Sequence, residues 1–378
     1  MISAKFVCDL LKNQDVDLFC GVPDSLLKDF CAYVTDNVPK NKNIITANEG
    51  NAIALAAGHY LATKKTALVY MQNSGIGNAI NPLLSLTDEE VYNIPLLIFV
   101  GWRGEPNKPD EPQHVKQGKV TGEIFDVCKI EHSVLPQDEK SAEMAINKAF
   151  EHIRATLKPY VFIISKGTFE KYEKKKIPKK FEMTREEAIC KVAEFIDKKD
   201  KNSVIISTTG QISRELYEYR ERSKQPHDKD FLTVGSMGHA SSIALGIALE
   251  KPQKTVYCFD GDGAILMHMG AMPVIAQQSP KNFKHILFNN EAHDSVGGQK
   301  TSADTVNFKE LATACGYKNA YSVERTEDLE KTLDDFIKSE APTLLEIKVQ
   351  CGARADLGRP KEKPVQNKIA FMEKLNAD

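Results

Sequence analysis

A Gly-Asp-Gly turn and an Asn-Asn pair are the residues of this sequence best suited to hold a metal ion. Asp262 lies between Gly261 and Gly263, and Asn290 follows it by 28 positions. Two glycines before a helix free backbone N–H groups to face a phosphate, but the charge of Asp262 would repel that anion. Mg²⁺ removes the conflict, because it commonly joins protein carboxylates and carbonyls to substrate phosphates.

The elements around this pair explain how the two residues can meet. A β-branched and aromatic run at 255–259 predicts a strand, residues 264–278 have helical spacing, and a second strand ends at Asn290. In a parallel βαβ unit both strand ends lie at one edge of the sheet, where ligands bind. Taken singly, Gly-Asp-Gly is also explained as an ordinary turn, and Asn-Asn as a polar strand end.

Two acidic residues of the first half are candidates for proton transfer. Glu49 precedes a predicted helix at 51–62 that is rich in alanine and poor in charge, so we expect this helix to be buried and Glu49 to lie in a dry place. A carboxylate in a first helical turn also complements the helix dipole without any further role. Asp24 and Ser25 lie in a turn before a predicted helix at 26–34, where capping alone could explain both.

Basic residues and histidines gather in segments that are predicted to be loops. Arg103, His114, Lys116 and Lys119 belong to or follow a proline-broken segment, 102–113, that is predicted to be irregular. Loops after predicted strands in the second half contain His293, Lys300, Arg354 and Arg359. Arginine in such loops suits an anion, although each residue is equally well explained as a solvated surface group.

The two halves of the chain repeat one order of elements. Three landmarks recur 186 to 189 positions apart: a glycine in an alanine-rich helix, a threonine that begins a strand, and a two-glycine turn. This repeat predicts two α/β domains with parallel sheets, at 1–170 and 183–378, joined by a lysine-rich linker at 171–182.

Composition excludes several classes of protein. With 378 residues, 42% of them hydrophobic, and a formal net charge of −2, the chain predicts a globular protein without a field that would attract nucleic acid. The longest strongly apolar run, 94–100, is too short to span a bilayer. We therefore expect no membrane association and a cytoplasmic location. The eight cysteines form no C-x-x-C pair, so we expect reduced thiols.

Gly-Asp-Gly followed after one helix by Asn-Asn resembles the cofactor motif of thiamine diphosphate-dependent decarboxylases. The resemblance covers nearly the whole chain and implies a pyrimidine-binding domain followed by a diphosphate-binding domain, with no middle domain. It implies that Asp262, Asn290 and the Ala292 carbonyl hold Mg²⁺, that Gly261 and Gly263 lie against the diphosphate, and that Glu49 hydrogen-bonds the pyrimidine. Met237 corresponds to the bulky residue under which the cofactor bends into a V, and Gly235 and Ser236 before it are predicted to bind the cofactor as well. Active sites between subunits are implied, and hence a homo-oligomer, at least a dimer.

Four longer strings resemble the branch of this family that decarboxylates phosphonopyruvate, and next the branch that acts on sulfopyruvate. They are G-V-P-D-S, G-W-R-G-E-P with D-E-P-Q-H, N-N-E-A-H-D-S-V-G-G-Q, and A-D-L-G-R-P. Where pyruvate decarboxylases have a catalytic glutamate, this chain has Val296, so we take Asp24, His114 and His293 with Glu49 as catalytic candidates. The predicted residues for the substrate, a 2-oxo acid with an anionic head such as phosphonopyruvate, are Ser25, Arg103, Lys116, Lys119, Lys300, Arg354 and Arg359. A thiamine diphosphate-binding regulatory protein without catalysis remains the alternative of another class.

Overall fold

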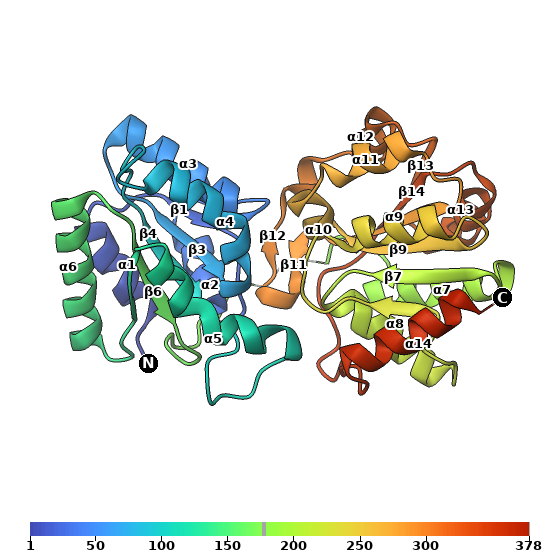
Figure 1. Cartoon of the computed structure of the whole chain (residues 1–378), viewed down its shortest axis with the longest axis horizontal. Helices are drawn as coiled ribbons and strands as arrows, with labels where there is room; N and C mark the ends of the chain where they lie inside the picture. The colour runs from blue at the N-terminus through green and yellow to red at the C-terminus, as the bar shows by residue number, and fades with distance from the viewer. Residues whose placement is uncertain (176–178, 378) are drawn as a thin grey trace. The chain divides into compact units, whose positions relative to one another are not determined.

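The computed structural model describes residues 1–175 and 179–377. Contacts divide the chain into two compact units, which are coloured from blue to red along the sequence in Figure 1. Unit 1 comprises Met1–Lys176 with Ser295–Gln299, and unit 2 comprises Ile177–Asp294 with Lys300–Asp378. Residues 176–178 of the predicted linker lie outside the described residues.

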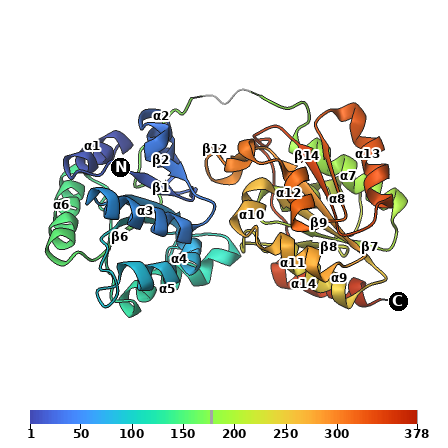
Figure 2. The same ribbon diagram turned by 90° about the horizontal axis from the view of Figure 1, so that it is seen from above.

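Unit 1 is built on a six-stranded parallel sheet with the strand order β2-β1-β3-β4-β6-β5. Its strands are β1 (Phe19–Gly21), β2 (Asn43–Ile45), β3 (Leu68–Gln72), β4 (Leu97–Gly101), β5 (Glu131–Val134) and β6 (Tyr160–Ile164). Helices α1 (Ala4–Asn13), α2 (Lys28–Asn37) and α6 (Glu139–Thr156) pack on one face. Helices α3 (Glu49–Thr63), α4 (Ile76–Pro82) and α5 (Pro112–Val127) cover the other face, as Figure 2 shows.

Unit 2 has a second six-stranded parallel sheet, with the order β13-β14-β10-β9-β7-β8. Its strands are β7 (Ser203–Ser207), β8 (Asp230–Leu232), β9 (Thr255–Gly261), β10 (Phe283–Asn289), β13 (Asn319–Val323) and β14 (Thr343–Lys348). Helices α7 (Arg185–Lys199), α8 (Gln211–Arg222) and α13 (Thr326–Lys338) pack on one face. The other face is covered by α9 (Ala240–Glu250), α10 (Asp262–Met267), α11 (Ala271–Gln278), α12 (Phe308–Cys315) and α14 (Pro364–Asn376).

Short elements complete the fold. Strands β11 (Ala292–His293) and β12 (Gln299–Lys300) pair in a separate two-stranded sheet. Single turns lie at η1 (Lys40–Lys42), η2 (Asn73–Gly75), η3 (Leu83–Thr87), η4 (Asp294–Val296) and η5 (Ser302–Thr305).

The predicted fold class is confirmed. The central strands of both large sheets are short, buried runs rich in Val, Ile, Leu and Phe, as expected where helices cover both faces of a parallel sheet. The strands β2, β5 and β13 are only partly buried. Within the described ranges, no helix combines the length and the apolar character needed to cross a bilayer. All eight cysteines are free thiols.

One predicted helix is divided in two. The sequence predicts a continuous helix over 264–278, but α10 ends at Met267 and α11 begins at Ala271. Pro273 explains the break, because proline inside a helix has no N–H to donate and its ring clashes with the carbonyl four residues earlier. Pro273 instead lies in the first turn of α11, where backbone N–H groups have no partner within the helix, so its missing N–H costs no hydrogen bond.

Two further predictions on the first half are wrong. Helix α3 is buried on one face only, and Leu61 on its other face is 73% exposed; alanine favours helices through its propensity as well as through burial. The predicted irregular segment ends at Glu111, because α5 begins at Pro112, a residue favoured in the first helical turn. His114, Lys116 and Lys119 therefore lie on a helix and not in a loop.

Candidate active site

Asp262 is the first residue of α10, directly after β9, and its side chain is only 2% exposed. Its Oδ2 accepts a hydrogen bond from the Thr301 hydroxyl at 2.5 Å. Burial raises the pKa of Asp262 to about 7, although the Thr301 hydroxyl and the backbone N–H groups of Asn290 and Gly263 oppose this rise. None of the ion pairs recorded for the described residues includes Asp262. A buried carboxylate that has only neutral donors around it favours the binding of a cation.

Asn290 directly follows β10, the parallel neighbour of β9, so the structure brings it beside Asp262. Its Nδ2 donates to Asp294 Oδ2 at 2.9 Å, and its Oδ1 accepts from the Ala292 N–H at 3.1 Å. Asn289 points elsewhere, because its Nδ2 donates to Glu346 on β14 at 2.7 Å. Of the two asparagines, only Asn290 is therefore available to a ligand next to Asp262.

The chain turns sharply between Asn290 and Ala292. Glu291 between them has φ +58°, the left-handed conformation that few non-glycine residues adopt. Its carboxylate is held by Lys180 Nζ at 2.6 and 2.7 Å. The resulting donor set, a carboxylate from Asp262 and an amide oxygen from Asn290, consists of the hard oxygen ligands that Mg²⁺ prefers. These residues fit the implied metal ion.

A close approach joins Gly263 to two other predicted residues. A Cβ atom at position 263 would lie 2.9 Å from His293 Cε1 and 3.3 Å from Met237 Cε, so a side chain there would clash. Burial lowers the pKa of His293 to about 4, which leaves its imidazole neutral at pH 7. Gly235 and Ser236 both have left-handed backbones, with φ +71° and +49°. The structure thus brings Gly263 against the side chains of Met237 and His293.

Glu49 in unit 1 is the first residue of α3 and is 4% exposed. Its Oε2 accepts from Asn78 Nδ2 at 2.8 Å. A Cβ atom on Gly75 would lie 2.1 Å from Glu49 Oε1, so the carboxyl group packs directly on that glycine. Burial raises the pKa of Glu49, and the hydrogen bond from Asn78 partly offsets the rise. A solvated carboxylate that only complements the helix dipole needs neither contact. Together the two contacts hold the Glu49 carboxyl group against the turn that follows β3.

Asp24 lies in the turn after β1 and is fully buried. Its Oδ1 accepts from Gln72 Nε2 at 2.6 Å and its Oδ2 from the Leu26 N–H at 2.8 Å. Burial raises the pKa of Asp24, and the hydrogen bond from Gln72 opposes this effect. Helix α2 begins only at Lys28 and has no side-chain cap. The interpretation of Asp24 or Ser25 as its N-cap is therefore wrong.

Arg103 brings Ser25 and an acidic partner together. Its Nη1 donates to Ser25 Oγ at 3.0 Å, while Nε and Nη2 donate to the two carboxylate oxygens of Asp110 at 2.9 and 2.5 Å. Burial favours a higher pKa for Asp110, but the hydrogen bonds from Arg103 and the Gly104 N–H lower it overall. The guanidinium group is thus held rigidly, and part of its charge is already balanced.

Of the other predicted residues, His114 lies near Arg103, and the rest are exposed or held in ion pairs. His114 is buried, and its pKa is lowered by burial and then by the charge of Arg103. Lys116, Lys119 and Arg359 are exposed. Lys300 is 68% exposed, with its Nζ 3.8 Å from Asp304. Arg354 forms ion pairs with three carboxylates, those of Glu186, Glu218 and Asp356.

Several contacts of the candidate residues in the two units were not predicted from the sequence. The partners are Gln72, Asn78, Asp110 and Thr301, which hydrogen-bond Asp24, Glu49, Arg103 and Asp262. Gln72 ends β3 and Asn78 lies in the first turn of α4, shortly after it, so the polar residues that follow a predicted strand were the available signal. Asp110 and Thr301 lie in irregular segments and leave no such signal.

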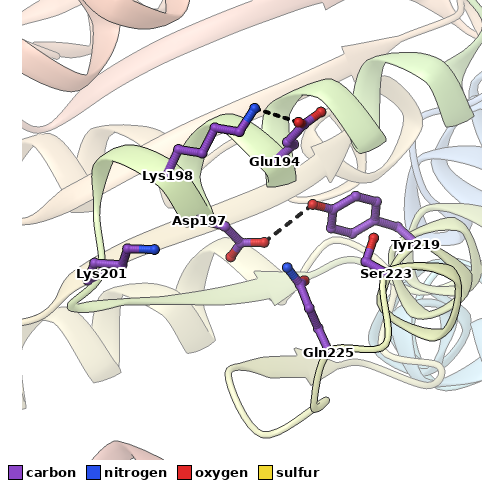
Figure 3. Close-up of a pocket in the computed structure, with 7 residues that line it drawn as sticks. All are labelled: Glu194, Asp197, Lys198, Lys201, Tyr219, Ser223 and Gln225. Atoms are coloured by element: carbon purple, nitrogen blue, oxygen red, sulfur yellow. Dashed lines mark hydrogen bonds and ion pairs between the residues drawn. The ribbon is translucent and has the colours of Figure 1, made fainter.

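A surface pocket in unit 2 does not belong to this site. It has a volume of about 480 Å³ and is lined by Glu194, Asp197, Lys198, Lys201, Tyr219, Ser223 and Gln225 (Figure 3). Lys198 pairs with Glu194 at 2.5 Å, and Tyr219 donates to Asp197 at 3.4 Å. None of the predicted site residues lines this pocket, and its polar groups are largely occupied with one another.

Comparison with known proteins places these residues in a family. The N-terminal TPP binding domain of thiamine pyrophosphate enzymes matches residues 1–127, and the C-terminal TPP binding domain of such enzymes matches residues 208–347. A phosphonopyruvate decarboxylase from Streptomyces viridochromogenes is 32% identical over 97% of this chain and 93% of its own length.

Two further relatives are similar over most of their length. A phosphonopyruvate decarboxylase from Streptomyces hygroscopicus is 32% identical, over 99% of this chain and 94% of its own. A sulfopyruvate decarboxylase from Methanosarcina acetivorans is 31% identical, over 87% of each chain. The family that the motifs predicted is thereby confirmed: the chain belongs to the thiamine pyrophosphate enzymes.

Proposed function

We propose that the protein is a carboxy-lyase that uses thiamine diphosphate and Mg²⁺ to convert phosphonopyruvate into phosphonoacetaldehyde and carbon dioxide. The observation that carries the proposal is the buried Asp262 carboxylate beside Asn290, because neutral donors alone surround a charge that a cation would balance. Similarity to decarboxylases over nearly the full chain supports the reaction class.

In this proposal each half of the chain holds one part of the cofactor. Asp262, Asn290 and the Ala292 carbonyl hold Mg²⁺, and the backbones of Gly261 and Gly263 lie against the diphosphate. Thiamine diphosphate, when bound, supplies a nucleophilic carbon and an electron sink for loss of carbon dioxide. Glu49 exchanges a proton with a ring nitrogen of the cofactor, a task suited to a carboxyl group whose pKa is raised by burial.

Ser25 and Arg103 bind the anionic substrate in this proposal. The Ser25 hydroxyl and Arg103 Nη1 already contact each other at 3.0 Å, so one anionic oxygen can accept from both groups. Asp24 lies next to Ser25 in the chain and is protonated more readily than an exposed acid. Together with His114 and His293 it remains a candidate for returning a proton to the product.

We predict that Asp262→Ala loses Mg²⁺ and with it the cofactor, since the main negative charge that offsets the metal is removed. We expect the dissociation constant for thiamine diphosphate in the presence of Mg²⁺ to rise by at least about 100-fold. Isothermal titration measures it, with Asp304→Asn as a control that neutralises a more exposed carboxylate of the same unit. Unchanged binding in Asp262→Ala would contradict the metal assignment.

We predict that Glu49→Gln keeps the fold and the cofactor but slows proton exchange at the reactive thiazolium carbon. The amide cannot transfer the proton, and general acid–base groups typically contribute about 10²- to 10⁴-fold to a rate. Hydrogen–deuterium exchange followed by NMR measures the effect.

A matched pair of glycine variants tests whether the position of Glu49 matters as well as its charge. Gly75→Ala forces the Glu49 carboxyl group to move, whereas a Cβ atom on Gly77, two residues further along, has no neighbouring atom within 4 Å. Exchange should slow in Gly75→Ala and remain near wild type in Gly77→Ala. If Glu49→Gln exchanged the thiazolium proton at the wild-type rate, Glu49 would have only a structural role.

We further propose a homo-oligomer in which Glu49 of one copy and Asp262 of another complete one site. Co-expression of Glu49→Gln with Asp262→Ala, each inactive alone, should then restore about a quarter of wild-type activity in a dimer, since half of the dimers are mixed and each has one intact site. Differently tagged chains and tandem purification isolate the mixed form. If that form is inactive, each chain builds its own site.

We predict a strong preference in kcat/KM for phosphonopyruvate over pyruvate, which lacks the second anionic head. Hydrogen bonds to charged groups contribute about 1.5 to 3 kcal/mol each, so Arg103→Gln should reduce this preference by about 10- to 100-fold. Arg154→Gln, in the last turn of α6, serves as the control. The assay measures carbon dioxide release from phosphonopyruvate, sulfopyruvate and pyruvate in parallel. Better turnover of sulfopyruvate would favour the activity named for the Methanosarcina relative. A preference for pyruvate would contradict a pocket for a second anionic group.

A further inference from the structure

We propose that Asp294 is a positioning residue for Asn290. In this proposal its carboxylate, held in place by Arg185, determines which end of the Asn290 amide faces the cation. The inference rests on the proposed function, because it assigns Asn290 to the metal, and it adds a residue that the sequence motifs did not single out.

One oxygen of Asp294 collects three donors. Oδ2 accepts from Asn290 Nδ2 at 2.9 Å, from Arg185 Nη1 at 2.8 Å and from the Gly352 N–H at 2.8 Å. The three donors come from the end of β10, the start of α7 and the segment after β14. Through these hydrogen bonds, Asp294 connects Asn290 with α7 and with the segment after β14.

The chemistry of the amide makes this contact directional. A carboxylate only accepts hydrogen bonds, so Asn290 must turn its NH₂ group toward Asp294. Its Oδ1 then faces away and accepts from the Ala292 N–H at 3.1 Å, which occupies one of two lone pairs. The second lone pair is left for a cation. If the amide were reversed, the NH₂ group would face the metal and repel it.

Arg185 is itself held rigidly. It is 4% exposed, and it donates through Nε and Nη2 to Glu215 at 2.8 and 3.0 Å. It begins α7, whose capping box at Thr184 and Glu187 fixes the start of the helix. The backbone of Asn290 is fixed as well, because Cys351 Sγ donates to its carbonyl at 2.9 Å. Arg185, Glu215 and Asp294 together carry one net negative charge, which adds to the attraction for a cation.

A purely structural role would predict a different outcome of mutation. If the network only joins α7, α8 and the end of β10, loss of Asp294 lowers stability and leaves metal affinity unchanged. Loss of a residue that hydrogen-bonds a metal ligand typically weakens metal affinity about 10- to 100-fold. Metal affinity, measured apart from activity and stability, therefore separates the two roles.

The experiment measures Mn²⁺ binding to the full chain by electron paramagnetic resonance at saturating thiamine diphosphate, in parallel with urea unfolding. We expect Asp294→Ala to raise the Mn²⁺ dissociation constant about 10- to 100-fold. Asp294→Asn should give an intermediate value, because its amide oxygen still accepts from Asn290 while the charge is gone. The control is Asp230→Asn, in which another buried arginine pair of unit 2, Arg220–Asp230, is weakened at the start of β8. It should unfold more easily yet bind Mn²⁺ within about threefold of wild type.

The outcomes distinguish this inference from the proposed function. If wild type binds no Mn²⁺ with thiamine diphosphate, the metal assignment fails and the inference fails with it. If wild type binds, Asp262→Ala does not, and Asp294→Ala binds like wild type, the positioning role alone is overturned. Should Asp294→Ala not fold, Asp294→Asn decides: wild-type affinity in that variant overturns the proposal, and weaker binding at normal stability supports it.

Discussion

A carboxylate that is buried without a positive partner is the constraint around which unit 2 is arranged. Moving such a charge out of water costs several kcal/mol even after the protein relaxes, and Asp262 recovers part of that cost from the Thr301 hydroxyl and nearby N–H groups. Its raised pKa indicates that these contacts do not suffice. Parallel strands bring Asn290 to the same edge, so a second residue with an oxygen that can bind a cation lies beside the charge.

Unit 1 has a buried acid, Glu49, at the equivalent edge of its own sheet, but the neighbours of its carboxyl group are different. Glu49 lies against Gly75 and accepts from a neutral amide, and burial raises its pKa. Burial raises the pKa of both acids, so their different roles under the proposed function depend on their neighbours: Asn290 lies beside Asp262 and can offer a cation a second oxygen, whereas Asn78 directs an amide N–H at Glu49. Under the proposed function, the same repeated α/β unit supports two chemistries, because the residues at the strand ends differ.

The sequence was sufficient for the features that depend on local pattern or on a known spacing. Alternation of short apolar runs with helical segments predicted both parallel sheets, and the 28 positions between Asp262 and Asn290 predicted that they meet. The sequence did not predict contacts between segments that lie far apart along the chain. Thr301, 39 positions after Asp262, approaches it only through the packing of an irregular segment, and Asp294 was one letter in a longer string. Lys116 and Lys119 were predicted in a loop, because a proline at 112 indicates a break as readily as a helix start.

The structure also changes how a preference for a doubly anionic substrate can arise. The sequence offers six cations, yet Arg354 is paired with three carboxylates and both lysines of α5 are exposed. Arg103 remains in contact with Ser25, and Asp110 already balances part of its charge. Under the proposed function, selectivity then depends on directed donors more than on the number of charges. Asp24 is buried beside this pair with a raised pKa, and in its protonated form it would donate a hydrogen bond to an anionic oxygen. A phosphonate carries more negative charge on its oxygens than a sulfonate does and gains more from such a donor, so the protonation state of Asp24 would separate two substrates of the same shape.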